Sequence, residues 1–298
     1  MREFHIGKND ENQRLDRFLG KAIPLLPASL AQKYIRLKRI KVNGARAQRD
    51  QKLVAGDILQ CYINDEFFES PSEENVYLTI TTPRLKIVYE DENIMLLDKP
   101  AGMLAHADEH EKVNTLVNHM LAYLYQKREW RPREENAFTP ALCNRIDRNT
   151  GGIVIAAKNA EALRILNDKI RDREIAKYYL CIALGCVEPP KGRIENFLRR
   201  DEKRKQVTLH DRPVPGAKTA KTLYRTLAST KELSLVECVL LTGRTHQIRA
   251  HMASIGCPLL GDGKYGRGDR NRACGETGQL LYSYELTFAF ESDAGALQ

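Results

Sequence analysis

The chain has 298 residues, 42% hydrophobic and 29% charged, a balance that describes a soluble globular protein with enough length for a sizeable core. Its 47 Lys and Arg residues outnumber its 39 Asp and Glu residues, and the net charge of +8 favours a polyanionic partner without separating RNA from DNA. No apolar run approaches the roughly 18 residues that cross a bilayer, the N-terminus shows no apolar signal core, and the seven cysteines form no CxxC motif. We therefore expect a cytoplasmic protein with reduced thiols, no membrane partner, and a monomeric state by default.

The first predicted unit is a small basic module over residues 12–63. Apolar residues recur at helical spacing near its start, and a capping box at Ser29 predicts the beginning of a second, basic helix. The segment VNGA then predicts a two-residue hairpin, and residues 58–63 are predicted to form a strand. The segments RLDRFL, KRIKVNG and LVAGDIL resemble an S4 RNA-binding domain. This resemblance implies RNA contacts from three cations: Lys38, Arg39 and Lys41. The alternative is a solvated basic helix on an unrelated small domain.

Residues 64–79 have the acidic and Ser/Pro-rich composition of a linker. A β segment is expected over 76–82, where the chain enters a second domain that runs from residue 80 to the end. In that domain, apolar patterning and turn signals predict strands over 87–89, 94–97, 177–184, 233–241 and 280–290, and helices around Met120, after a cap at Asn159, and over 243–255. Two basic loops, at 199–205 and 264–272, are expected to contact phosphate.

The stretch ALCNRIDRNTGGIVIAAK, residues 141–158, is the most informative. Asp147 sits between Arg145 and Arg148, ahead of a glycine pair and a run typical of a buried strand. A carboxylate held at a sheet edge among cations is expected to stay ionised, which suits a nucleophile or base better than a general acid. An ordinary surface ion pair at a strand end is the alternative.

The segment R-I-D-R-N-T-G-G resembles the signature H-R-L-D-x-x-T-S-G of the RluA-type pseudouridine synthases. The resemblance implies that Asp147 is the catalytic residue, that Arg145 fills the space left by a flipped base, and that Arg148 and Thr150 contact RNA. This chain departs from the pattern with Asn144 in place of His and Gly151 in place of Ser. Those two changes leave the Arg-x-Asp core intact.

Two more segments carry the same resemblance. TGRTHQIRAHMASIG, residues 242–256, contains the family motif R-T-H-Q-I-R residue for residue, which implies that Arg244 pairs with Asp147 and that Arg249 contacts RNA. Lys177-Tyr178-Tyr179 is similar to the family's K-x-Y motif, which implies that Tyr179 faces the active site, to stack on a base or to transfer a proton. The alternatives are surface ion pairs of the arginines and a half-buried strand tyrosine.

The implied fold class is α+β: an S4-type α/β module, then a catalytic domain with a mixed, largely antiparallel sheet and flanking helices. The implied activity converts specific uridines in structured RNA to pseudouridine. The favoured RNA is large-subunit ribosomal RNA, with transfer RNA second. The order of chemical steps at Asp147 stays open among attack on C1′, attack on the ring, and removal of the 2′ proton, which we favour.

No cofactor and no metal are expected. His246 and His251 are five residues apart, about 140° around a helix, and cannot share an ion. The residues around His106 and His110 have the composition of a loop, so a metal site on one helix face is not expected there. The segment GCPLLGDGK lacks the Ser or Thr that follows Gly-Lys in a phosphate-binding loop. A non-catalytic RNA-binding or ribosome-assembly factor remains as the alternative from another class. A glycosidase would need a second carboxylate beside Asp147.

Overall fold

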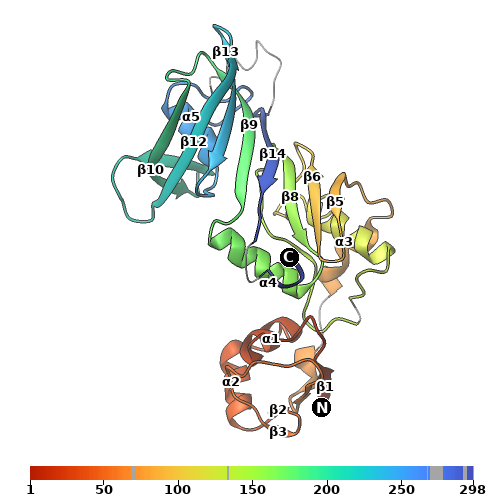
Figure 1. Ribbon diagram of the computed structural model, residues 1–298. Coiled ribbons are helices and arrows are strands. Elements are labelled where there is room, and N and C mark those ends of the chain that lie inside the picture. The colour runs from red at the N-terminus through yellow and green to blue at the C-terminus, as the bar shows by residue number, and fades with distance from the viewer. Residues whose placement is uncertain (69–71, 133, 267, 269–277, 291–293, 298) are drawn as a thin grey trace.

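The protein is built around two β-sheets with separate hydrophobic cores, as the computed structural model shows (Figure 1). The structure describes residues 1–68, 72–132, 134–266, 268, 278–290 and 294–297. A four-stranded sheet near the N-terminus has the order β1-β4-β2-β3, and a ten-stranded sheet forms the larger unit. The α+β class with a largely antiparallel sheet is therefore confirmed. No helix in the described part of the chain has the length and hydrophobicity of a bilayer-spanning segment.

The N-terminal unit comprises β1 (Arg2–His5), α1 (Leu15–Ala22), α2 (Ala28–Arg36), β2 (Ile40–Val42), β3 (Ala45–Arg46) and β4 (Ile58–Cys61). The predicted hairpin is present, because Asn43 and Gly44 take positive φ values of 52° and 74°. β1 pairs with β4, so the small sheet starts ahead of residue 12. The predicted capping box at Ser29 is wrong: α2 begins after Pro27 without a side-chain cap.

Two short 3-10 helices, η1 (Asp65–Phe68) and η2 (Ser72–Thr79), connect the units. The predicted β segment over 76–82 is therefore wrong. Tyr77 is 4% exposed, and its ring packs 5.1 Å from Trp130 and 5.9 Å from Tyr125, measured between centroids. Burying this ring among aromatics stabilises a compact connection over an extended one.

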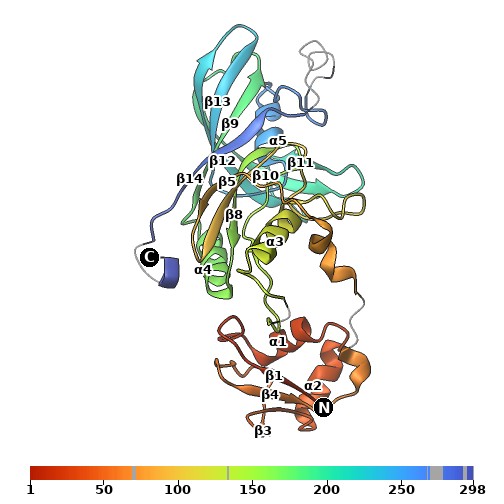
Figure 2. The same cartoon turned by 90° about the vertical axis from the view of Figure 1, so that its right-hand side faces the viewer.

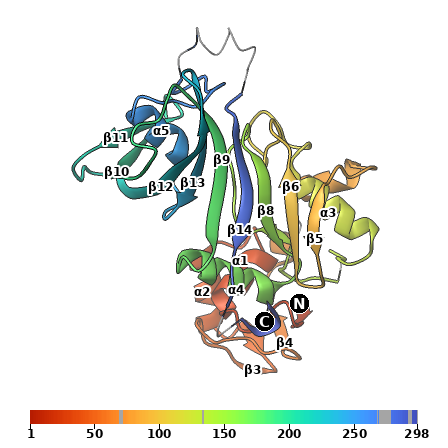
Figure 3. The same ribbon diagram turned by 45° about the horizontal axis from the view of Figure 1, so that its top comes forward.

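The large sheet has the order β11-β10-β12-β13-β9-β14-β8-β6-β5, and β7 pairs with β8. Its strands are β5 (Ile87–Glu90), β6 (Ile94–Lys99), β7 (Ala141–Leu142), β8 (Gly151–Ala157), β9 (Ala176–Leu184), β10 (Lys191–Asp201), β11 (Gln206–His210), β12 (Lys218–Ser229), β13 (Leu233–Leu240) and β14 (Leu281–Thr287). The last strand, β14, lies between β9 and β8 in the middle of the sheet (Figure 3). It pairs parallel with β8, and the other pairings are antiparallel.

The basic segment 199–205 is only partly the loop that the sequence predicts. Residues 202–205 form the turn of a hairpin, whereas Arg199 and Arg200 lie on β10. Both arginines are exposed, and they continue the strand because they pair with Thr208 and Val207 of β11.

Within the residues that the structure describes, three α-helices and one short 3-10 helix accompany the large sheet: α3 (Leu116–Gln126), α4 (Ala160–Arg171), α5 (Gln247–Ser254) and η3 (Gly295–Leu297). The cap of α4 is confirmed, since Asn159 Oδ1 accepts the N–H of Ala162 at 2.9 Å. α5 starts later than predicted, because His246 has a left-handed φ of 54°. α5 lies beside β10–β12, whereas α3 lies near β5 and β6 (Figure 3).

The N-terminal unit touches the larger unit beside α4 (Figure 2). Asn9 donates to Glu135 at 2.8 Å and accepts the N–H of Ala160, the first residue of α4. Asn136 donates to the carbonyl of His5 and to the buried Asp10. These hydrogen bonds connect the loop after β1 with the larger unit.

Candidate active site

Asp147 lies in the loop between β7 and β8, next to the point where β14 pairs with β8. The N–H of Thr150 closes this loop by donating to the carbonyl of Asp147 at 3.0 Å. Gly152 has a φ of +109°, and a Cβ there would lie 2.2 Å from the carbonyl oxygen of Ser283. The tight approach of β14 therefore requires glycine at this position and sets the direction in which the Asp147 loop leaves the sheet.

A cavity of about 290 Å³ opens beside Asp147. Its walls come from the Asp147 loop, from β9, and from the segment leading into α5. The predicted site residues that line it are Arg145, Asp147, Thr150, Tyr179, Arg244 and Arg249. Residues separated by about a hundred positions in the chain thus meet around one space, whose volume is at the lower end of small-ligand pockets.

Arg249, and not Arg244, is the arginine that faces Asp147. Arg249 Nη1 lies 3.5 Å from Asp147 Oδ2, whereas the described contacts of the Arg244 side chain include a hydrogen bond from Nε to the carbonyl of Thr219. The pairing predicted for Arg244 is therefore wrong, although Arg244 does line the cavity. Arg249 is 5% exposed and lines the cavity, so its predicted contact with RNA stays a prediction and would be made inside the cavity.

Arg249 is held from behind by Asp262, a fully buried carboxylate. Arg249 Nε and Nη2 each donate to Asp262 at 2.8 Å, in the two-pronged geometry of a strong ion pair. Burial opposes ionisation of Asp262, but the hydrogen bonds and charge of Arg249 outweigh it and hold the pKa of this carboxyl below its ordinary value. The third guanidinium nitrogen of Arg249 is left to face Asp147.

His246 and Tyr265 complete the surroundings of Asp147. His246 Nε2 lies 3.9 Å from Asp147 Oδ2, and Nδ1 lies 2.9 Å from the Tyr265 hydroxyl. The Tyr265 ring also lies under the guanidinium of Arg249, 5.3 Å from its centroid. Sequence reasoning considered His246 only as a metal ligand and missed Asp262 and Tyr265, which follow the R-T-H-Q-I-R motif by more than a dozen residues.

The other predicted site residues take different positions. Tyr179 is 6% exposed, and burial raises the pKa of its hydroxyl to about 12. Thr150 is 2% exposed, lines the cavity, and its hydroxyl accepts a hydrogen bond from Gln279 at 3.3 Å, so its predicted contact with RNA stays a prediction. Arg145 is exposed at the cavity edge, whereas Arg148 is exposed outside this cavity, where its Nε donates to the carbonyl of Gly102.

Comparison with known proteins matches residues 93–254 to the family described as RNA pseudouridylate synthase. The chain belongs to this family. The uncharacterized RNA pseudouridine synthase of Mycoplasma genitalium is 32% identical over 289 residues, covering 96% of this chain and 88% of the relative. The ribosomal large subunit pseudouridine synthase D of Neisseria meningitidis serogroup A is 31% identical, covering 92% of this chain and 71% of the relative.

Solved structures show the same fold. Human RNA pseudouridylate synthase domain containing 1 aligns with a TM-score of 0.55 at 20% identity, covering 72% of this chain and 87% of that protein. The synthase activity, an isomerisation of uridine in RNA, follows from the family and from the named relatives.

The synthase uses Asn144, where the family signature has His, as a backbone partner. Asn144 Oδ1 accepts the N–H of Ile155 on β8 at 2.8 Å. Gly151, where the signature has Ser, lies against Tyr282: a Cβ would come 2.8 Å from its ring. Both departures are therefore accommodated by local contacts and leave the Asp147 loop in place.

Lys99 ties the Asp147 loop to the preceding Asp98–Gly102 segment of the synthase. Its side chain is fully buried, and Nζ donates to the carbonyls of Pro100, Met103 and Arg148 at 2.7–3.0 Å. Three carbonyls from two loops converge on one ammonium, so Lys99 determines how these loops sit together.

A second cavity of about 490 Å³ shares the Asp147 wall of the synthase. Its lining includes six Lys and Arg residues, drawn from the Asp147 loop, the β10–β11 hairpin, α5 and the segment after α5: Arg145, Arg148, Arg200, Lys205, Arg249 and Lys264. Lys264 Nζ donates to the carbonyl of Lys205, which joins the first basic segment to the described start of the second. The remainder of that second segment, 267 and 269–272, lies outside the described residues.

Proposed function

We propose that this synthase converts uridine to pseudouridine in large-subunit ribosomal RNA, with Asp147 as the catalytic residue. The observation that carries this proposal is the placement of Asp147 on the wall of a nucleotide-sized cavity, with Tyr179 buried in the same wall. The ribosomal RNA substrate is supported by the printed names of relatives that match most of this chain, from Neisseria meningitidis and Rickettsia bellii.

The reaction rearranges one nucleotide without a net gain or loss of atoms. The bond from N1 of uracil to C1′ of ribose breaks, the base turns, and C5 forms a new bond to C1′. C5 loses its hydrogen as a proton and N1 gains one. Among the routes open to Asp147, we favour removal of the 2′ proton to give a glycal, with the proton returned when the new bond forms.

The target uridine must leave its stack to reach the cavity, at a cost of a few kcal/mol. Arg145 is exposed at the cavity edge and is our candidate for filling the vacated space. The buried Tyr179 presents a ring to the base and a hydroxyl that keeps its proton at neutral pH. The cations of the second cavity would then meet the phosphates that flank the target.

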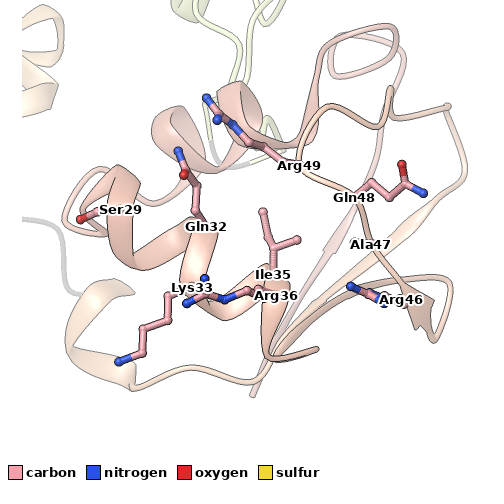
Figure 4. Close-up of a pocket in the computed structure, with 9 residues that line it drawn as sticks. All are labelled: Ser29, Gln32, Lys33, Ile35, Arg36, Arg46, Ala47, Gln48 and Arg49. Atoms are coloured by element: carbon pink, nitrogen blue, oxygen red, sulfur yellow. The ribbon is translucent and has the colours of Figure 1, made fainter.

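The N-terminal unit is proposed to be an S4-type RNA-binding module. A hollow of about 630 Å³ lies between α2 and the segment around β3, with Lys33 and Arg36 on one side and Arg46 and Arg49 on the other (Figure 4). The predicted cations Lys38, Arg39 and Lys41 do not line this hollow but follow α2 directly. Arg39 lies over Tyr34 at 5.6 Å and Lys41 over Tyr62 at 5.4 Å, measured to the ring centroids.

The dependence of RNA affinity on salt concentration tests RNA binding by this module separately from turnover. Arg46→Ala should weaken RNA binding about equally for all sequences and lower the slope of log affinity against log salt by about 1 if Arg46 contacts one phosphate. Lys52→Ala, an exposed cation outside the hollow, is the matched control. Equal slopes for both variants and the wild type would show that the hollow does not contact RNA phosphates.

The proposed function is tested by mapping pseudouridine in total cellular RNA from cells that carry only Asp147→Ala. Asp211→Ala, an exposed carboxylate outside both cavities, is the control. Loss of specific large-subunit ribosomal sites supports the proposal and names the uridine. Loss of transfer RNA sites would move the substrate to that class, and an unchanged map at normal expression would remove Asp147 as the catalytic residue.

A further inference from the structure

We propose that Tyr265 is a positioning residue that fixes the tautomer of His246, so that the Nε2–H of His246 faces one of the two carboxylate oxygens of Asp147. This inference rests on the proposed function, in which Asp147 is catalytic. Tyr265 lies 118 positions after Asp147 in the chain, and it reaches Asp147 only through His246 and Arg249.

A backbone amide supports this direction of the hydrogen bonds. The N–H of Val207, on β11, donates to the Tyr265 hydroxyl oxygen at 2.7 Å. A backbone N–H can only donate, so the hydroxyl oxygen accepts here and its own hydrogen is available for His246 Nδ1 at 2.9 Å. An Nδ1 that accepts leaves the imidazole proton on Nε2, the nitrogen on the side of Asp147.

The contacts of Asp147 fall on one oxygen. Arg249 Nη1 at 3.5 Å and His246 Nε2 at 3.9 Å both face Oδ2. Within the described residues, no ion pair or side-chain hydrogen bond reaches Oδ1. Because Arg249 is fixed by Asp262 and His246 by Tyr265, Oδ2 is held from two directions. Oδ1 is thereby left for the substrate.

The environment of His246 keeps its imidazole neutral. Burial lowers the pKa of His246 to about 4, and the charges that face it act in both directions. Carboxylates from the β7–β8 loop and the segment after α5 raise it, and cations from α5 and that segment lower it: Asp147, Asp262, Arg249 and Lys264. Tyr265 is the other titratable group in contact, and its hydrogen bond to Nδ1 exists only with the neutral ring.

Removing the Tyr265 hydroxyl should therefore make His246 easier to protonate. In Tyr265→Phe, Nδ1 loses its donor, and a protonated ring beside Asp147 becomes more favourable. A cationic imidazolium would pair with the carboxylate and withdraw it from the substrate. The loss should grow as pH falls, because more imidazole is protonated, and should disappear as pH rises above the new pKa.

The activity test uses large-subunit ribosomal RNA transcribed with [5-³H]uridine, since the new C5 bond displaces the C5 hydrogen into water. If the pKa of His246 rises by about one unit from about 4, about half of the imidazole is protonated at pH 5, so Tyr265→Phe should lower kcat about twofold at pH 5 and leave it unchanged at pH 8.5, with KM unchanged. Tyr284→Phe, which removes a hydroxyl bound to Glu237 at 2.6 Å, is the control and should match wild type.

A double-mutant cycle isolates the coupling. In a His246→Gln background, which cannot change protonation state, Tyr265→Phe should cost nothing further at any pH. A loss in Tyr265→Phe that is equal at pH 5 and pH 8.5, or that adds fully to the loss in His246→Gln, would show a merely structural role and overturn the inference.

A measurement without RNA keeps this inference separate from the proposed function. Side-chain NMR of the free protein, with His246 assigned by its absence in His246→Gln, should show protonation in Tyr265→Phe at a higher pH than in wild type. Unchanged titration in the variant overturns the inference even if turnover is normal. Normal turnover in Asp147→Ala overturns the proposed function even if the titration shifts as expected.

Discussion

Replacing Asp262 with Asn tests whether Arg249 is held in place by its buried ion pair. The substitution keeps the size of the side chain but removes its charge, and it sets an amide N–H₂ against one of the donating nitrogens of Arg249. Both donor distances are 2.8 Å in the wild type, and both side chains are at most 5% exposed. Neither charge can therefore turn to solvent to compensate.

The expected cost follows from this burial. Breaking a buried ion pair by neutralising one partner costs about 3–5 kcal/mol. Asp147 at 3.5 Å still compensates part of the Arg249 charge, so we expect the lower end, about 3 kcal/mol. For a chain of this size, that corresponds to a fall in Tm of roughly 6–12 °C.

Thermal unfolding of Asp262→Asn at neutral pH measures this cost. Glu195→Gln is the matched control, because Glu195 also has two short ion pairs, to Arg193 at 2.5 Å and Lys221 at 2.7 Å, but is 42% exposed. An exposed pair should contribute less than about 1 kcal/mol. A fall in Tm no larger than that of Glu195→Gln would refute the view that this pair fixes Arg249.

The dependence on pH gives a second test of the same prediction. The pKa of Asp262 is lower in the folded protein than in the unfolded chain, where it is near 3.9. The ionised Asp262 therefore stabilises the fold above this unfolded-state pKa, and the stabilisation is lost as the pH falls through the lower pKa of the folded state. The difference in stability between wild type and Asp262→Asn should therefore be constant above about pH 5 and shrink below about pH 4.

Three further predictions concern the sheet, the acid stability and the substrate. Gly152→Ala should lower the free energy of unfolding, measured in urea, by about 2–3 kcal/mol more than Gly216→Ala does. Both glycines have positive φ, but only at Gly152 would a Cβ clash with Ser283. Equal losses in the two variants would contradict the clash. Burial lowers the pKa of His251 to about 4. The free energy of unfolding should therefore fall by about 3 kcal/mol as the pH drops from about 6.5 to 4, because the unfolded chain binds the proton more readily. His251→Gln should make the free energy of unfolding less dependent on pH over this range. Arg145→Ala should reduce turnover far more at duplexed uridines than at an unstructured loop, and equal losses on both would exclude a role in filling the vacated stack.

Much of the local structure could be predicted because it depends on neighbours in sequence. The Asn43–Gly44 turn needs only two residues that tolerate positive φ, and the Asn159 cap needs only a side-chain oxygen ahead of an amphipathic run. The same holds for the Asp147 loop, in which the acid, its flanking arginines and the glycine pair are contiguous. The family resemblance was readable there for that reason.

Predictions failed where a local pattern was overridden by contacts from a distance. The helix predicted from residue 243 would have placed Arg244 in its first turn. The left-handed His246 delays the helix to Gln247, so that Arg244 lies on the approach and Arg249 lies in the buried first turn. The basic segment 199–205 was predicted as a loop from its charges, but Arg199 and Arg200 continue β10 because they pair with β11.

The sequence by itself determined the class of this protein, the candidate acid and the order of its motifs, because these depend on residue identity and short spacing. Only the tertiary structure decided which arginine faces Asp147 and which residues support it. Asp262 and Tyr265 contact the site because the segment after α5 folds back beside β11, a long-range arrangement set by sheet register and burial. Spacing along the chain does not encode such proximity, since it arises from the packing of elements that are remote in sequence.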